Sequence, residues 1–180
     1  MDDPRRTPFI VVGVLSDTHG HLYPEVLKSM QGVDHIVHAG DVGSPEVLRV
    51  LRAVAPVTAV RGNCDLEAWA EVLPSQAEVT LGGARILVGH VGQRLLRRSG
   101  SGELGAAQGI AAVVFGHSHL ASVEERDQVL YLNPGSAGPR RFGRPRTVAR
   151  LEIFPLGADQ SGAEPQVRPR VSAAILPVGD

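Results

Sequence analysis

The sequence predicts an α/β fold in which two β-sheets pack face to face and helices cover the outside. Two patterns lead to this prediction. Short runs rich in Val and Ile alternate with helical periodicity in the first half of the chain, which is typical of parallel βαβ units. Strands in the second half follow one another more closely, which favours hairpins and antiparallel pairing. No internal repeat or low-complexity tract interrupts residues 1–155.

The first half is predicted to contain three strands and two helices. The strands are expected over residues 9–15, 35–38 and 57–60. One helix should begin at Pro24 and stop at Gly32, because proline is favoured in the first turn and glycine just beyond the last. A second helix should begin at Pro45, with Ser44 as its N-cap and an apolar stripe on one face. Strands and helices therefore alternate as parallel units require.

The second half is predicted to contain mainly strands. Gly82-Gly83 should join strands 78–81 and 85–88 as a hairpin, and a short helix is expected between Gly102 and Gln108. Further strands are expected over 112–115, 122–125, 128–132 and 147–154. Residues 171–176 are expected to form either an edge strand or part of a loose tail. We therefore expect one domain over residues 1–180, with a flexible N-terminus over 1–8 and a loose tail or edge strand over 155–180.

The composition excludes several classes of protein. Apolar residues make up 43% of the chain, which argues against disorder. With 18 basic and 19 acidic residues, the chain is not a polycation that binds nucleic acid through bulk charge. The single cysteine, Cys64, excludes an internal disulfide and suits a reducing compartment, so we expect a cytoplasmic protein. The apolar runs are too short to cross a bilayer and the N-terminus does not resemble a secretory signal, so no membrane association is expected.

Residues able to bind metal ions follow the predicted strands, at the strand ends where ligands gather in α/β sheets. Seven of them offer an oxygen or an imidazole nitrogen: Asp17, His19, Asp41, Asn63, His90, His117 and His119. Such donors without thiolate suit Mn, Fe, Zn or Ni. Seven ligands are too many for one ion, but two ions sharing one carboxylate would have four each. Paired ions of this kind are the usual arrangement for hydrolysing phosphate esters.

The order and spacing of these residues resemble the motifs of the calcineurin-like metallophosphoesterase superfamily. The motifs that carry the resemblance are Asp17-x-His19, Gly40-Asp41, Gly62-Asn63, His90 and Gly116-His117-x-His119. Cys64 and the segment Asn133-Pro134-Gly135-Ser136 resemble the small single-domain phosphodiesterases of bacteria and archaea. The resemblance runs from about residue 11 to 141, and it implies a four-layer α/β/β/α sandwich with two mixed β-sheets.

The resemblance also implies a role for each ligand. Asp17, His19 and His119 would bind the first metal, Asn63, His90 and His117 would bind the second, and Asp41 would bridge them. Mn is the metal expected first, with Zn, Fe, Ni or Mg as alternatives. A water that bridges two dications loses a proton near neutral pH, and the resulting hydroxide would attack phosphorus in line. We expect Asp41, Asn63 and His90 to be catalytic as well as metal ligands.

Cys64 departs from the pattern of many superfamily members. They have a histidine there that is thought to protonate the leaving group, whereas a thiol with a pKa of ~8.5 is a poor proton donor to an alkoxide. The sequence therefore predicts a preference for substrates with good leaving groups, such as aryl diesters, or another donor such as His21 or His38.

Two arginine clusters follow the predicted ligands along the chain. Arg140, Arg141, Arg144 and Arg146 form one cluster, and Arg94, Arg97 and Arg98 form the other. Each cluster is interpreted either as a solvated loop or as a surface that receives an anionic substrate.

Three functions fit the sequence. The first is a metal-dependent phosphodiesterase that acts on small phosphodiesters or nucleotide-like substrates. The second is a phosphomonoesterase or nucleotide phosphatase on the same dimetal centre. The third is a non-catalytic scaffold resembling the retromer subunit of this family, although all seven ligand positions hold competent residues here. Nucleic acid as a substrate and a homo-oligomeric state stay open.

Overall fold

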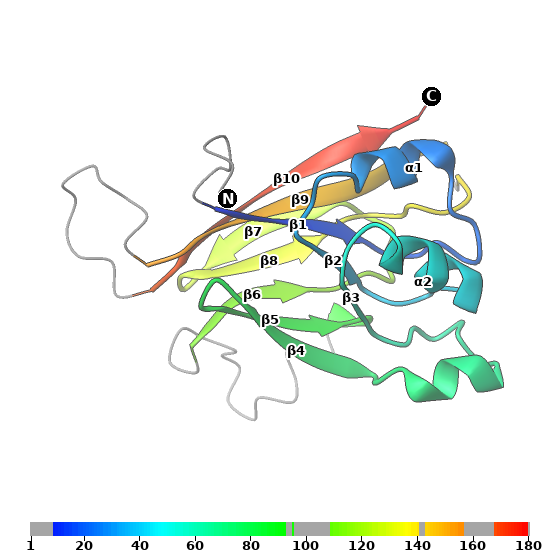
Figure 1. Cartoon of the computed structure of the whole chain (residues 1–180), viewed down its shortest axis with the longest axis horizontal. Coiled ribbons are helices and arrows are strands. Elements are labelled where there is room, and N and C mark those ends of the chain that lie inside the picture. The colour runs from blue at the N-terminus through cyan, green and yellow to red at the C-terminus, as the bar shows by residue number, and fades with distance from the viewer. Residues whose placement is uncertain (1–8, 93–94, 96–108, 141–142, 157–167, 180) are drawn as a thin grey trace.

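Two five-stranded β-sheets form the body of the molecule (Figure 1). This computed structural model describes all residues except 1–8, 93–94, 96–108, 141–142, 157–167 and 180. The predicted flexible N-terminus and the helix expected between Gly102 and Gln108 lie outside the described residues, as do Arg141, Arg94, Arg97 and Arg98. Among the helices of the described part, none is long and apolar enough to span a membrane.

The first sheet has the strand order β10-β9-β1-β2-β3. Its strands are β1 (Ile10–Leu15), β2 (His35–His38), β3 (Val57–Ala59), β9 (Arg146–Phe154) and β10 (Arg170–Val178). β1, β2 and β3 are parallel, as the βαβ pattern predicts, and β9 pairs antiparallel with both β1 and β10. Of the two alternatives for residues 171–176, the structure has the edge strand, because β10 pairs along its whole length with β9.

The second sheet has the strand order β4-β5-β6-β8-β7. Its strands are β4 (Gln76–Leu81), β5 (Ala84–Gly89), β6 (Ile110–Val114), β7 (Ser122–Arg126) and β8 (Val129–Asn133). Gly82 and Gly83 form the predicted hairpin turn, and both have the positive φ that a tight two-residue turn requires. The two outer pairs are antiparallel and the two central pairs are parallel, so this sheet is mixed.

Both helices begin where the sequence predicts, and the first ends earlier than predicted. α1 (Pro24–Ser29) and α2 (Pro45–Arg52) each start at a proline. α1 stops before Gly32, and Ser44 occupies the N-cap position of α2 without a side-chain capping hydrogen bond. A 3₁₀ helix, η1 (Ala68–Val72), follows β3.

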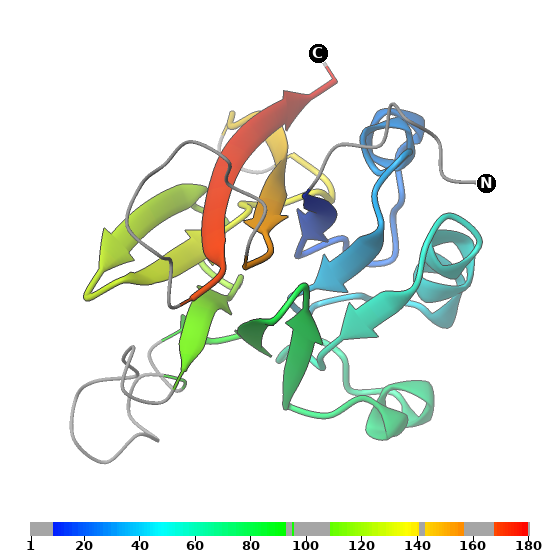
Figure 2. The ribbon, with the colours of Figure 1, turned by 60° about the vertical axis from the view of Figure 1, so that its left-hand side comes forward.

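Three apolar clusters hold the layers together. The first lies between the sheets and contains Val12, Val14, Ile86 and Val114. A second cluster packs α1 and α2 on the outer face of the first sheet, and Figure 2 shows these helices beside β1, β2 and β3. A third lies on the outer face of the second sheet, where Leu95 packs with β6 and β8. The α/β architecture predicted from the sequence, with two mixed sheets, is confirmed.

Candidate metal centre

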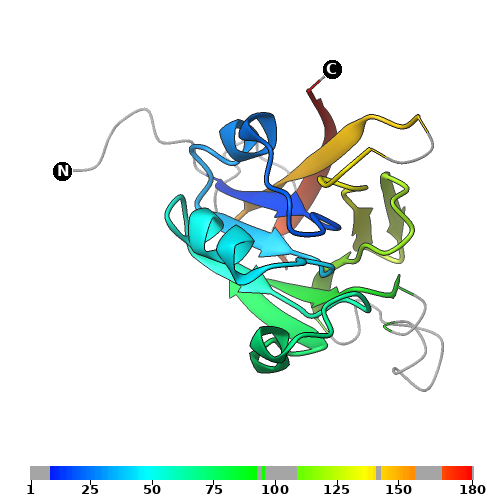
Figure 3. The ribbon, with the colours of Figure 1, turned by 90° about the vertical axis from the view of Figure 1, so that its right-hand side faces the viewer.

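The loops that follow five strands meet at one end of the two sheets (Figure 3). Backbone hydrogen bonds of 3.0 Å join them: the N–H of Asp17 donates to the Gly40 carbonyl, His19 to Asp41, and Gly116 to His90. Each bond connects a loop that carries one predicted ligand to a loop that carries another. Hydrogen bonds from the His117 N–H to Asp17 and from the Cys64 N–H to Asp41 link these pairs to each other and to the loop of Asn63, so all the motif-bearing loops lie in one neighbourhood.

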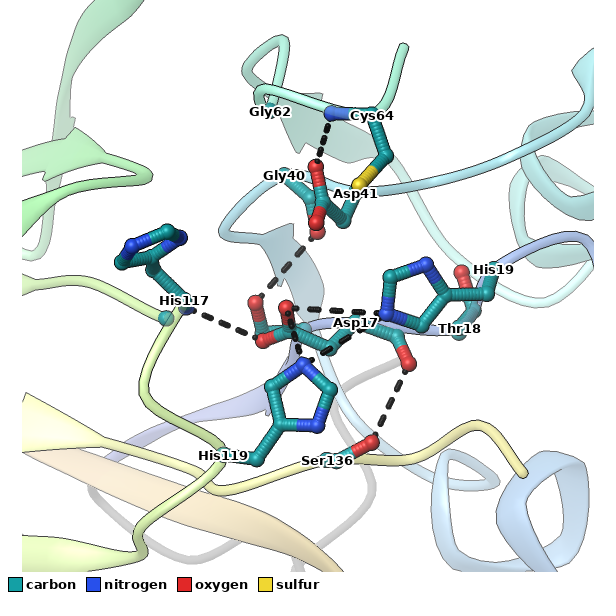
Figure 4. A network of polar contacts seen from close by, with 12 residues as sticks. Asp17, Thr18, His19, Gly40, Asp41, Gly62, Cys64, His117, His119 and Ser136 are labelled. Carbon is teal, nitrogen blue, oxygen red and sulfur yellow. Dashed lines mark hydrogen bonds and ion pairs between the residues drawn. The ribbon is translucent and has the colours of Figure 1, made fainter. Parts of the chain in front are cut away.

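The carboxylate of Asp17 lies at the centre of the first group of ligands. It is fully buried, and its Oδ2 accepts a 3.2 Å hydrogen bond from the backbone N–H of His117. Its Oδ1 has no hydrogen-bond partner within the described part of the chain. The Nε2 atom of His119 lies 3.1 Å from Oδ1, and those of His19 and His90 each lie 4.0 Å away. Figure 4 shows the His19 and His119 rings turned toward this carboxylate.

This arrangement fits a cation. A buried carboxylate oxygen without a partner is costly, and protein interiors satisfy such atoms with hydrogen bonds or metal ions. The Nε2 atoms of His19 and His119 are also only 3.5 Å apart. Both nitrogens can therefore reach one ion bound at Asp17.

A second group of ligands forms around Asn63. Its Oδ1 lies 3.1 Å from Nε2 of His90 and 2.8 Å from Nδ1 of His117. The Nδ1–H of His90 donates to the Ala39 carbonyl at 2.8 Å, which aims Nε2 at the centre of the group. The amide oxygen of Asn63 can bind a metal without adding negative charge.

Asp41 lies between the two groups. Its carboxylate forms one group with the ligand atoms of Asp17 and His90 and another with those of His19 and Cys64. Within each group, the ligand atoms all lie within 4.8 Å of one another. The Sγ atom of Cys64 was not expected among the metal-ligand candidates. Asp41 therefore lies close to predicted ligands of both groups.

Hydrogen bonds set the charge of Asp41 and His90. Nε2 of His90 lies 3.3 Å from Oδ2 of Asp41. Burial raises the pKa of the Asp41 carboxyl, but hydrogen bonds from His90 and from the Cys64 N–H at 2.8 Å outweigh it and hold the pKa below its usual range. Burial lowers the pKa of His90, but Asp41 and the Ala39 carbonyl outweigh it and raise the pKa. A metal ion bound to Nε2 would have to displace this proton.

The backbone is strained at most of the predicted ligands. Five have positive φ angles: Asp17 (57°), His19 (47°), Asp41 (52°), His117 (69°) and His119 (57°). Elsewhere in the described residues, only Asp127 and Gln128 of the β7–β8 turn share this conformation among non-glycine residues. Such conformations persist where surrounding structure imposes them, and they cluster at functional sites.

Two motif glycines are required by close approach. A Cβ atom at Gly62 would meet the carboxylate and backbone of Asp41. A Cβ atom at Gly116 would meet the Ser16 hydroxyl and would lie 2.8 Å from Oδ2 of Asp17. Any larger residue at either position would push a predicted ligand out of place.

Asp65 has a positioning role that the sequence analysis did not assign. Its buried carboxylate accepts hydrogen bonds from the backbone N–H groups of Val42 (3.1 Å), Gly43 (2.8 Å) and Gly62 (2.8 Å). It thereby ties the loop that carries Asp41 to the loop that carries Asn63. The available signal was an acidic residue two positions after a ligand, but two of its three partners, the N–H groups of Val42 and Gly43, belong to another loop, and no sequence motif marks that contact.

The two alternative proton donors have different surroundings. The Thr18 hydroxyl donates to the Val42 carbonyl at 2.9 Å, so the 2.9 Å contact between Thr18 and His38 is donated by Nε2–H of His38. Burial lowers the pKa of His38 to about 4, and the ring is fully buried. His38 is therefore a neutral core residue that cannot reach a leaving group. His21 is exposed, and its ring hydrogen-bonds the His19 carbonyl at 2.9 Å.

Comparisons with known proteins point to one family. A model of the calcineurin-like phosphoesterase superfamily domain matches residues 10–154. A probable metallophosphoesterase of Methanothermobacter thermautotrophicus is 31% identical over 159 residues, covering 83% of this chain and 91% of the relative. Phosphodiesterase YfcE of Escherichia coli is 32% identical over 160 residues, covering 76% of this chain and 84% of the relative. The solved structure of Vacuolar Protein Sorting 29 from Cryptosporidium parvum has a TM-score of 0.67 at 18% identity, covering 94% of this chain and 98% of that chain, and shares the fold.

Proposed function

Because this chain belongs to the calcineurin-like phosphoesterase superfamily, we propose that it is a phosphodiesterase that uses two divalent metal ions to hydrolyse small phosphodiesters. Its membership makes it a metal-dependent phosphoesterase, and the preference for diesters and the pairing of the ions are our proposal. The observation that supports the proposal most directly is the buried Oδ1 of Asp17, which faces three imidazole nitrogens but has no hydrogen-bond partner in the described chain.

The proposed ligands divide into two sets that share Asp41. Asp17, His19 and His119 would hold one ion, and Asn63, His90 and His117 would hold the other. Oxygen and imidazole donors of this kind suit Mn, which we propose as the metal. When bound, the ions would act as Lewis acids toward the phosphate oxygens and lower the pKa of the attacking water.

The chain's own residues keep these ligands in the state that catalysis needs. The hydrogen bonds to Asp41 keep its carboxylate ionised across the neutral range. The Ala39 carbonyl fixes the orientation of the His90 ring, and Asp65 holds the loops of Asp41 and Asn63 together. We therefore propose Asp41, Asn63 and His90 as the catalytic residues that also bind metal.

Cys64 bears on the choice of substrate. The thiol is exposed, and the Asn63 amide lies 3.4 Å from its Sγ. A thiol in this position is a poor proton donor to an alkoxide. We therefore propose that the protein hydrolyses diesters with good leaving groups, such as aryl esters, faster than alkyl diesters.

Metal analysis and turnover together test the proposal. The Mn-loaded protein should hold two ions per chain and should hydrolyse bis-p-nitrophenyl phosphate faster than p-nitrophenyl phosphate. Asp17→Asn should lower both metal content and turnover, by roughly a hundredfold for turnover. Asp127→Asn is the matched control, because Asp127 is exposed in the β7–β8 turn.

Other outcomes favour the other functions. Faster hydrolysis of the monoester would favour a phosphomonoesterase. A folded protein with neither metal uptake nor hydrolysis would favour a scaffold. The likeness to Vacuolar Protein Sorting 29 does not favour the scaffold by itself, because at this level of identity it concerns the fold alone.

A further inference from the structure

A positively charged cavity opens beside the candidate metal centre. It has a volume of about 340 Å³, and His117 and His119 form part of its wall. Its remaining wall includes Arg140, Arg144 and Arg146, and no acidic residue among those that the structure describes lines it. We call this cavity the arginine pocket. A cavity of this volume is in the range of pockets that bind small organic ligands. Because two predicted metal ligands border it, one small substrate can reach both the metal centre and the arginines.

Two of the three arginines are held in place by neutral groups. Nη2 of Arg140 donates to the Gly179 carbonyl at 3.0 Å, and Nε of Arg146 donates to the Gly138 carbonyl at 3.1 Å. The Arg146 guanidinium also lies 3.5 Å from the centre of the Tyr23 ring. Carbonyl and aromatic partners orient a guanidinium without neutralising its charge. Both arginines thus remain available to an anion.

Arg144 is the arginine most able to bind a ligand. Its side chain is exposed, and within the described ranges the guanidinium makes no hydrogen bond and no ion pair. No ion pair within those ranges joins Arg140 or Arg146 to an acid either. Three uncompensated guanidinium groups on one wall favour a multiply charged anion over the single charge of a diester.

We propose that the arginine pocket binds a second phosphate group of the substrate. The preferred substrate is then a phosphodiester that carries a phosphate monoester on one of its two alcohol groups. The diester lies against the metal centre while the monoester lies against the arginines. A guanidinium matches the phosphate dianion because it donates two parallel hydrogen bonds to it. This inference rests on the proposed function, since it describes the substrate of the same site.

A matched pair of substrates tests the proposal. The two substrates are thymidine 5′-(p-nitrophenyl phosphate) with a free 3′-hydroxyl and the same compound with a 3′-phosphate. The ester bond that is hydrolysed is the same in both. We expect the 3′-phosphate to lower KM about tenfold in the Mn-loaded wild-type protein. Arg144→Gln should raise KM for the 3′-phosphorylated substrate about fivefold, leave its kcat unchanged, and leave both constants for the 3′-hydroxyl substrate unchanged. Arg52→Gln removes a charge from the end of α2, away from the cavity, and should change nothing.

The results separate this inference from the proposed function. Equal KM values for the two substrates, or an equal loss with both in Arg144→Gln, would overturn the arginine pocket and leave the diesterase intact. If the wild-type protein hydrolysed neither substrate, the proposed function would fail, and calorimetry on the metal-free protein would still decide the pocket. In this calorimetric measurement, thymidine 3′,5′-bisphosphate should bind about fivefold more weakly to metal-free Arg144→Gln than to the metal-free wild-type protein. Identical binding to both proteins would refute the pocket.

Discussion

Replacing Asp65 with asparagine takes away one of the two acceptor oxygens that join the loops after β2 and β3. Oδ2 of Asp65 accepts from the N–H groups of Val42 and Gly62, and Oδ1 accepts from that of Gly43. An amide has one acceptor oxygen, so in either orientation at least one backbone N–H faces an NH₂ group. Asp65 is only 3% exposed, so water does not replace the lost acceptor. The loss of a charge-assisted hydrogen bond and the unsatisfied N–H together cost about 2–4 kcal/mol.

Urea unfolding measures this cost directly. The free energy of unfolding of Asp65→Asn should fall by about 3 kcal/mol with an unchanged m-value, and the thermal midpoint should fall by roughly 6–12 °C for a chain of this length. Metal affinity should fall as well, by about tenfold or more, because Asp41 and Asn63 lie on the two loops that Asp65 joins. Asp127→Asn, in an exposed turn, should change stability by less than about 0.5 kcal/mol. If Asp65→Asn were as stable as this control, Asp65 would not hold the two loops together.

Three further predictions follow from other residues. Cys64→His should raise the turnover of alkyl diesters at least about tenfold more than that of aryl diesters, because imidazole is a better general acid; equal gains with both would contradict the leaving-group argument. Burial lowers the pKa of His38 from 6.5 to about 4, so the unfolded chain binds the proton more tightly. The contribution of His38 to the free energy of unfolding should be complete above pH 6.5 and should fall by about 3 kcal/mol as the pH drops to 4. Urea unfolding at a series of pH values measures this, and in His38→Gln the free energy of unfolding should depend less on pH. Gly62→Ala should abolish metal uptake, measured by elemental analysis, because the added Cβ meets the Asp41 carboxylate.

The elements of the fold could be predicted because they depend on local patterns. The βαβ units, the proline-started helices and the Gly82-Gly83 hairpin each have a signal within a few neighbouring residues. The order of the strands could not be predicted in this way. β9 lies next to β1 although β2 to β8 separate them in the chain, and β8 lies between β6 and β7. Which distant strands pair depends on how both faces of each sheet are buried.

The candidate ligands could likewise be predicted, because their chemical types and their places after strands are properties of the sequence. Their environment could not. The contact between Asp65 and a neighbouring loop joins residues about twenty positions apart, and the burial that keeps His38 neutral comes from surrounding layers. From the sequence alone, Arg144 could equally be a solvated loop residue, and only the structure shows that it lines the cavity beside His117.

The amino-acid sequence alone determined which donors this protein has and that they follow β-strands. Only the tertiary structure decided that Oδ1 of Asp17 faces the Nε2 atoms of His19, His90 and His119 without a hydrogen bond. The physical reason is that the chemistry of a side chain belongs to the residue itself. The distance between two side chains a hundred positions apart is instead set by the packing of two sheets against each other, to which nearly every buried residue contributes.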